Sequence, residues 1–145
     1  MSGKPSVLFV CVHNAGKSQM AAGLMTNLAG DAIDVRSAGT APGTEVNAES
    51  AASLAELGID ITGEHPKAIT ADHVHAVDVV VVLGREAQVQ PVEGTRLERW
   101  DTVEPSEQGI EGMERIRLIR EDIAARVQTL AAELGARPAV GPVAQ

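Results

Sequence analysis

The residues best suited to chemistry lie together in one short segment, Cys11-Val12-His13-Asn14-Ala15-Gly16-Lys17-Ser18. It follows an apolar run and precedes a helical pattern. Backbone N–H groups at such a junction form an anion-binding site, which the helix dipole reinforces. Gly16 permits a close backbone approach to the anion, and Lys17 adds a positive charge. The segment therefore predicts a cradle for an oxyanion.

Cys11 gives this cradle a reactive group. A thiol at the mouth of an anion-binding loop lies in positive potential, which stabilises the thiolate and makes the sulfur a nucleophile at neutral pH. Ser18 is placed to donate a hydrogen bond to that thiolate. A free cysteine near a strand end is often only a small buried hydrophobe, but the Asn, Gly, Lys and Ser residues that follow Cys11 favour the nucleophile.

Strand and helix patterns alternate along the chain and position this loop. Apolar runs and weaker β patterns predict strands at 7–12, 32–37, 77–83 and 95–100. Helical spacing of apolar residues predicts helices at 17–29, 47–57, near Thr70 and at 109–134. The alternation is typical of an α/β fold: a doubly wound, four-stranded parallel sheet, flavodoxin-like, in three layers α/β/α. Ligands bind such sheets beyond the carboxyl ends of the strands, where the loop after the first strand lies.

Length and composition limit the partners. The 145 residues predict a single domain at 1–135, followed by a disordered tail at 136–145. The net charge of −8 predicts that the protein binds no nucleic acid and no membrane, because a protein needs a basic surface to bind either of them. No apolar run is long enough for a membrane span. A single cysteine without a signal-peptide pattern at 1–6 predicts a cytoplasmic protein.

Five motifs in order resemble the low-molecular-weight phosphatase fold family, and within it the arsenate reductase branch. The family's loop is a Cys, five residues, an Arg and a Ser. Cys11 and Ser18 keep that spacing, and Asn14, Gln19 and Met20 match the arsenate-reductase form of it. Four further matches follow: 37–40, the stretch of 56–60 with 66–70, 78–83 and 100–105. The resemblance covers most of the chain and implies the family's fold.

The resemblance also implies roles for the loop residues. Cys11 is the nucleophile, and Ser18 stabilises its thiolate. The oxyanion is bound by the backbone N–H groups of Val12, His13, Asn14, Ala15, Gly16, Lys17 and Ser18. Asn14 braces the loop, with Ser37 and His65 as its expected supports. Where the family has an Arg, this chain has Lys17, which offers a point charge in place of a two-pronged guanidinium.

A general acid is implied by the family's Asp-Pro loop. Here the corresponding segment reads Trp100-Asp101-Thr102-Val103-Glu104-Pro105. Aligned on the proline, Glu104 takes the position of the acid, and Asp101 is the alternative. A protonated carboxyl there would donate to the leaving oxygen of arsenate or phosphate.

The cysteine count distinguishes reactions within the family. Thioredoxin-coupled arsenate reductases carry three cysteines, whereas Cys11 is the only one here and Gly84 stands where the second would be. An internal disulfide relay is excluded, so an external thiol must act. The chain therefore resembles the arsenate–mycothiol transferases, in which mycothiol is the co-substrate and a mycoredoxin reduces the adduct. No bound cofactor is expected, and no metal site, because the histidines lack metal-ligand spacing.

Three other functions stay open at this point. A low-molecular-weight protein tyrosine phosphatase needs the same loop and acid, but such enzymes wall their pocket with aromatic side chains, and this chain has only Phe9 and Trp100. The residues Gly16-Lys17-Ser18 also match the last three positions of a nucleotide-binding P-loop, although Cys11 stands where that motif has its first glycine. A non-catalytic anion-binding relative would share the loop without turnover. We rank arsenate chemistry first and the phosphatase second.

Overall fold

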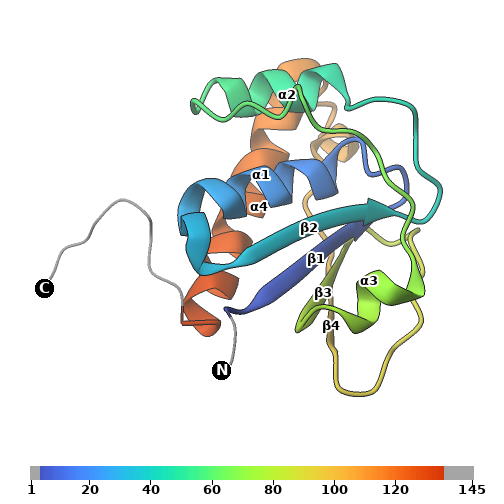
Figure 1. Cartoon of the computed structure of the whole chain (residues 1–145). Coiled ribbons are helices and arrows are strands. Elements are labelled where there is room, and N and C mark those ends of the chain that lie inside the picture. The colour runs from blue at the N-terminus through green and yellow to red at the C-terminus, as the bar shows by residue number, and fades with distance from the viewer. Residues whose placement is uncertain (1–3, 136–145) are drawn as a thin grey trace, which may run out of the picture.

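A computed structural model describes residues 4–135 of the chain, and strands and helices alternate in the predicted order (Figure 1). The strands are β1 Ser6–Cys11, β2 Asp34–Gly39, β3 Val79–Leu83 and β4 Arg96–Trp100. The helices are α1 Lys17–Ala29, α2 Ala48–Ala55, α3 Ala71–His75 and α4 Gly112–Glu133, with 3₁₀ turns η1 Gly30–Ala32 and η2 Pro105–Gln108. The tail expected at 136–145 lies outside the described residues.

All four strands are parallel, in the order β2-β1-β3-β4. This is the doubly wound, flavodoxin-like sheet that the sequence predicts. The chain runs from β1 outward to β2 and then crosses to β3 on the other side, so the segment after β1 lies at the switch point. The register sets Cys11 level with Gly39, and Leu83 level with Trp100, at the carboxyl edge of the sheet.

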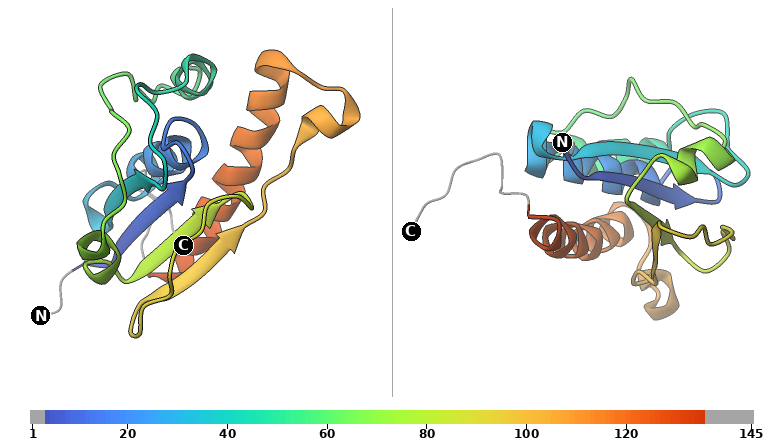
Figure 2. Two further views of the ribbon diagram at one scale, coloured as in Figure 1. Left: turned by 90° about the vertical axis from the view of Figure 1, so that its right-hand side faces the viewer. Right: turned by 60° about the horizontal axis from the view of Figure 1, so that its bottom comes forward.

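The two central strands are buried on both faces, as their continuous apolar runs predict. Val7 and Phe9 of β1 face the larger core, which they share with α1 and α4. Leu8 and Val10 face the opposite core, which α3 and the segment after β3 cover. In the left view of Figure 2, α4 passes behind β3 and β4. The helix α2 packs on α1 and α4.

The helices differ from the prediction mainly at their ends. The bounds of α1 are those predicted, whereas α2 is shorter, and Asn47 caps it by accepting a hydrogen bond from the Ser50 N–H at 2.9 Å. The helix α4 begins three residues later than predicted, because Pro105 opens the turn η2 and Gly109 ends it with a φ of 81°. Within residues 4–135, no helix is long and apolar enough to cross a membrane.

Gly39 brings the end of β2 against the loop that carries Cys11. A Cβ at this position would lie 2.7 Å from the carbonyl oxygen of Val12 and 2.9 Å from the Cβ of Asn14. On its other side, the Gly39 N–H donates to the carbonyl of Lys67 at 2.7 Å, and the Gly39 carbonyl accepts from the Ile69 N–H at 2.9 Å. The loop is therefore held to the end of β2 through a position with no room for a side chain.

We predict that Gly39→Ala lowers the free energy of unfolding by about 1–3 kcal/mol, because the added methyl overpacks a backbone contact that has little freedom to move. The loop must shift to make room, so inorganic phosphate should also bind more weakly. Urea unfolding and calorimetry measure both effects. Gly63→Ala is the control, since nothing lies within 4 Å of a Cβ at that position. Equal stability and equal phosphate affinity of the two variants would contradict the prediction.

Candidate active site

The backbone carbonyls of the Cys11 loop (residues 11–16) are occupied by the segment that follows β2. Cys11 O accepts from Thr40 N–H (3.1 Å), Val12 O from Ala41 (2.7 Å), His13 O from Gly43 (2.9 Å) and Ala15 O from Asn47 (2.7 Å). In the described part of the chain, the N–H groups of His13, Ala15 and Gly16 have no hydrogen-bond acceptor. A trans peptide points its N–H away from its C=O. The His13 and Gly16 N–H groups therefore face away from this segment, and the Ala15 N–H faces away from Gln19, which bonds the Asn14 carbonyl; the three N–H groups are available as a nest for an anion.

The N-terminus of α1 opens into the same nest. Its N-cap is Gly16, which has no side chain to accept a hydrogen bond from the first turn, and no acidic residue lies in that turn. The first N–H groups of the helix and the positive end of its dipole therefore stay available to a ligand. Loop and helix together make one site for an oxyanion.

Two hydrogen-bond donors face the sulfur of Cys11, which is 9% exposed. Its Sγ accepts from the Asn14 N–H at 3.3 Å and lies 3.0 Å from Ser18 Oγ. The Asn14 side-chain Nδ2 donates to the same Ser18 Oγ at 2.7 Å. Because an amide N–H can only donate, Ser18 accepts that bond and has its own proton left for the sulfur. The sulfur of Cys11 therefore has two hydrogen-bond donors directed at it.

Asn14 holds the loop in its shape. It is fully buried, and among the described residues it is the one non-glycine residue with a positive φ, 51°. Asparagine adopts this left-handed conformation more readily than most residues. Its Oδ1 accepts from the Lys67 N–H at 2.9 Å, while its Nδ2 is bonded to Ser18. One side chain thus joins the loop, the first turn of α1 and the segment at 67.

Gln19 also supports the Cys11 loop, and its hydrogen bonds show which part of His65 contributes to that support. Its Nε2 donates to the carbonyls of Asn14 at 3.1 Å and His65 at 3.3 Å. His65 therefore supports the loop through its backbone. Ser37, the other expected support, is buried in β2 and, within residues 4–135, has no hydrogen bond with Asn14. It lines a separate cavity of about 500 Å³ next to α1.

A hollow of about 520 Å³, here called the Cys11 hollow, opens at the sulfur. The Cys11 loop forms one side of it, and residues of α2 and α4 form another. Lys17 lines this hollow and also an adjoining one of about 370 Å³, which contains Asp101 and Glu104. Among the described residues, Lys17 has no ion-pair partner. It is therefore available to an anion bound in the nest.

Glu104 is held as a carboxylate by Arg115 of α4. The guanidinium makes a bidentate contact with the carboxylate: Nε donates to Oε2 at 2.6 Å and Nη2 donates to Oε1 at 2.9 Å. Ser106 donates to the same Oε2 at 2.7 Å through its hydroxyl. The Arg115 hydrogen bonds, with those of Ser106, lower the pKa of Glu104 from 4.5 to about 2. The carboxyl is thus ionised at neutral pH in this arrangement.

Asp101 is held in the same way by a different arginine. Arg85 donates to its Oδ2 through Nη2 at 2.6 Å and Nε at 3.1 Å. The pKa of Asp101 is lowered mainly by this hydrogen bonding, with smaller contributions from the charges of Arg85, Arg126 and Lys17. Both candidates for the general acid are therefore carboxylates, and either can donate a proton only after its ion pair opens.

The family to which this site belongs follows from comparison with known sequences. The family model described as low molecular weight phosphotyrosine protein phosphatase matches residues 6–139. The chain belongs to this family. The four-stranded parallel sheet and the loop that carries Cys11 lie within the matched residues.

The relatives of this phosphatase-family chain include arsenate reductases. The arsenate reductase of Halalkalibacterium halodurans is 34% identical over 137 residues, covering 88% of this chain and 96% of that one. A glutaredoxin arsenate reductase of a Synechocystis species is 32% identical over 131 residues, covering 88% and 97%. The solved structure of a thioredoxin-dependent arsenate reductase of Corynebacterium glutamicum has a TM-score of 0.79 at 34% identity. The match covers 92% of this chain but only 63% of that longer one.

The sequence alone does not identify every residue that shapes the site of this family member. The structure brings Cys11, Asn14 and Ser18 together, whereas Glu104 and Asp101 lie in the adjoining hollow. Gln19 and Lys67 match the family's motifs, but nothing in their spacing indicates that both bond Asn14. Arg115 had no motif at all, and only its position in the first turn of α4, shortly after the acidic loop, could have suggested it. Among residues 4–135, no group of three or more His, Cys, Asp or Glu could hold a metal.

We predict that Glu104→Gln removes a pH-dependent part of the stability. The folded pKa of about 2 lies below the ordinary 4.5, so the carboxylate stabilises the fold above about pH 4.5 and loses that effect as the pH falls toward 2. The difference in free energy of unfolding between wild type and variant should therefore shrink below pH 4.5. Denaturant unfolding across pH 2–7 measures it. Glu107→Gln, at an exposed position of the same turn, is the control, and a difference between wild type and Glu104→Gln that is constant with pH would refute the ion pair.

Proposed function

We propose that the protein is an arsenate reductase that acts as an arsenate–mycothiol transferase, the first step in reducing arsenate to arsenite. One observation carries the proposal: the only cysteine of the chain lies under a nest of backbone N–H groups, with two hydrogen-bond donors on its sulfur. Such a site binds a tetrahedral oxyanion against a nucleophile. The similarity to arsenate reductases supports arsenate as that oxyanion.

Two bond exchanges at arsenic precede its reduction in this proposal. The Cys11 thiolate attacks arsenic, and one arsenate oxygen takes up protons and leaves as water, so that a sulfur–arsenic bond replaces an oxygen–arsenic bond. The sulfur of mycothiol then displaces Cys11, which leaves as a thiolate. Arsenic stays pentavalent through both steps. A thiol of mycoredoxin afterwards attacks the mycothiol sulfur; arsenite departs with two electrons, and a mixed disulfide remains.

The chain's own residues have distinct parts in this scheme. The nest and Lys17 offset the charge of arsenate, and Ser18, oriented by Asn14, stabilises Cys11 whenever it is a thiolate. The proton for the leaving oxygen is assigned to the acidic loop, to Glu104 first and Asp101 second. Since arginines hold both as carboxylates, the assignment requires one ion pair to open when the oxyanion binds.

An external thiol is favoured by the cysteine count. With Cys11 alone, no second sulfur in these 145 residues can form the disulfide that would return electrons to the site. The relatives named above differ in their partners, one being called a glutaredoxin enzyme and another thioredoxin-dependent. The source of electrons therefore varies around a common arsenate site, and mycothiol with mycoredoxin is the pair we propose for this chain.

Phosphotyrosine hydrolysis is ranked second because the hollow lacks aromatic walls. Phe9 and Trp100 are the only Phe, Trp or Tyr residues of the chain. Their ring centroids lie 5.7 Å apart, and both side chains are buried in the core below the sheet edge, outside the Cys11 hollow. The described lining of the Cys11 hollow therefore offers no Phe, Trp or Tyr side chain to an aromatic ring of the substrate, whereas a small polar oxyanion requires no such wall.

The deciding experiment is a coupled assay. The purified protein receives arsenate with mycothiol and mycoredoxin, arsenate with thioredoxin, or para-nitrophenyl phosphate alone. Arsenite formed only with the mycothiol system is the expected result. Cys11→Ser should abolish it without unfolding the protein, because the two side chains are nearly isosteric. Turnover by the serine variant would overturn the mechanism, and phosphate release without arsenite would move the protein to the phosphatases.

We also predict that Lys17→Arg tightens oxyanion binding, because a guanidinium donates two parallel hydrogen bonds where an ammonium offers a point charge. The inhibition constant of inorganic phosphate should fall by several-fold. Steady-state inhibition against arsenate measures it, and Lys4→Arg, on an exposed residue before β1, is the control. An unchanged inhibition constant would mean that Lys17 does not touch the anion.

A further inference from the structure

The Cys11 hollow is far larger than its proposed oxyanion. Its volume of about 520 Å³ is in the range of sites that bind small organic molecules. A tetrahedral oxyanion in the nest occupies only the part next to the loop. The rest extends to α2 and α4, which carry polar side chains that the arsenate chemistry does not use. This inference rests on the proposed function, under which the thiol co-substrate is the ligand that fills the rest of this space.

Arg115 presents unused donors to this space. Its Nε and Nη2 are committed to Glu104, which leaves Nη1 without a partner in the described structure. Its pKa is raised mainly by the hydrogen bonds of Glu104, with further contributions from the charges of Glu111 and Glu49. Glu49, on α2, lines the same hollow, so the guanidinium lies within reach of carboxylates on two elements. A guanidinium fixed in this way is oriented before any ligand arrives.

Ser50 contributes a hydroxyl to the wall of the hollow. The residue is only 2% exposed, and its Oγ has no hydrogen bond within residues 4–135. The Oγ lies 3.5 Å from the place where a side chain on Gly16 would begin, so it faces the Cys11 loop. This hydroxyl is therefore available to a ligand that reaches between α2 and the loop.

The charges of the hollow select the class of thiol. Glu49 and Glu86 are its carboxylates, while Lys17 faces the oxyanion and Arg115 is already neutralised by Glu104. Once arsenate is bound, the remaining field is negative, as is the whole chain at −8. A thiol that carries carboxylates of its own would be repelled. A hydroxyl group both donates and accepts, which suits a wall made of a guanidinium, a carboxylate and a serine.

We propose that Glu49, Ser50 and Arg115 form the subsite for the body of the thiol co-substrate, and that this subsite takes an uncharged, polyhydroxylated thiol. The ligand lies with its sulfur toward Cys11 and its hydroxyl groups against α2 and α4. Until its ion pair with Arg115 opens, Glu104 also orients the guanidinium toward this subsite.

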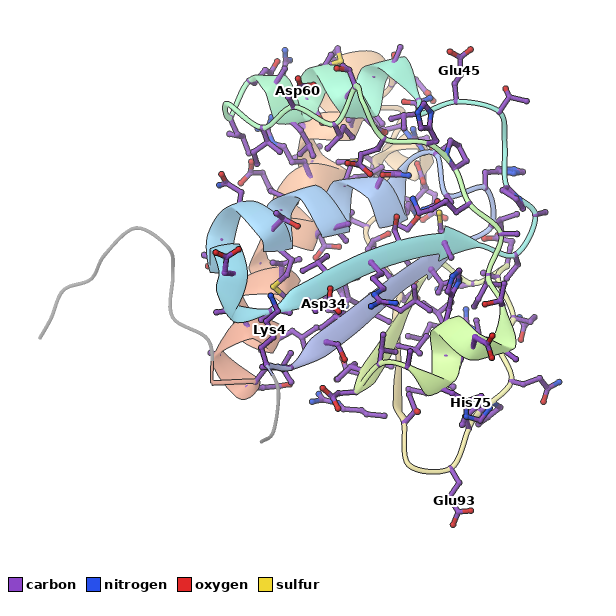
Figure 3. All side chains as sticks on the ribbon, viewed as in Figure 1. Lys4, Asp34, Glu45, Asp60, His75 and Glu93 are labelled. Carbon is purple, nitrogen blue, oxygen red and sulfur yellow. The ribbon has the colours of Figure 1, made fainter. Side chains whose placement is uncertain are left out.

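Binding of S-methyl mycothiol, which cannot react, tests the subsite directly by calorimetry. Glu49→Gln and Arg115→Gln should each weaken its binding by about tenfold, since each loses a charge-assisted hydrogen bond. Their charge-matched controls are Glu45→Gln and Arg36→Gln. Glu45 points away from the molecule in Figure 3, and Arg36 is paired with Asp34 outside the hollow. The controls should bind the probe like the wild type.

Inorganic phosphate and S-methyl glutathione complete the test. All four variants should bind phosphate as the wild type does, and the wild type should bind S-methyl glutathione at least about tenfold more weakly than the mycothiol probe. Loss of phosphate binding in Arg115→Gln would place that residue in the oxyanion site and overturn the subsite. The subsite would also be overturned if Glu49→Gln and Arg115→Gln both bound S-methyl mycothiol as the wild type does, or if the wild type bound S-methyl mycothiol and S-methyl glutathione equally well.

The same data separate this inference from the proposed function. If the variants lose the probe but the wild type forms no arsenite, the proposed function fails and the subsite stands. If the wild type forms arsenite with mycothiol while the KM for mycothiol is unchanged in Glu49→Gln and Arg115→Gln, the subsite fails alone. Ser50→Ala, with Ser53→Ala as its control on the same helix, gives a third readout of the KM.

Discussion

The buried side-chain amide of Asn14 is the interaction on which the site depends. Its two polar atoms bond Ser18 of α1 and the backbone at Lys67, while its own backbone adopts a left-handed turn. The turn directs the Asn14 N–H to the sulfur of Cys11, and the amide decides that the Ser18 proton points to the same atom. Thiolate, nest and helix terminus are therefore one bonded unit, and a disturbance at any of these atoms reaches the others.

This unit is carried by the sheet and closed by segments distant in the sequence. The parallel pairing sets Cys11 level with Gly39, and the missing side chain of Gly39 lets the two strand ends approach. The residues after β2 then occupy the carbonyls of the loop, so its N–H groups are the ones left for a ligand. The anion site thus follows from how the hydrogen bonds of the loop are shared out: its backbone carbonyls have partners elsewhere in the protein, whereas the N–H groups of His13, Ala15 and Gly16 have none within residues 4–135.

The sequence predicted the architecture well, because local signals determine it. The continuous apolar runs of β1 and β3 can be satisfied only by burial on both faces, and the alternation with helices leaves few topologies other than a parallel sheet. Local sequence patterns do not predict the hydrogen-bond partners of Asn14 and Glu104. Lys67 is 53 positions from Asn14, and Arg115 is 11 from Glu104, across a 3₁₀ turn that no apolar pattern marks. Spacing identifies which residues could do chemistry, but three-dimensional packing decides which arginine neutralises which acid.

The attachment of α2 has a consequence for how such proteins diverge. Glu56 at its end is bonded by both Arg117 and Arg120 of α4, so the wall opposite the Cys11 loop is anchored to another helix. Among the described residues, no side chain on that wall is bonded to Asn14 or Ser18. Under the function proposed above, a lineage could therefore exchange one reductant for another by changes in α2 and α4 and keep the oxyanion site.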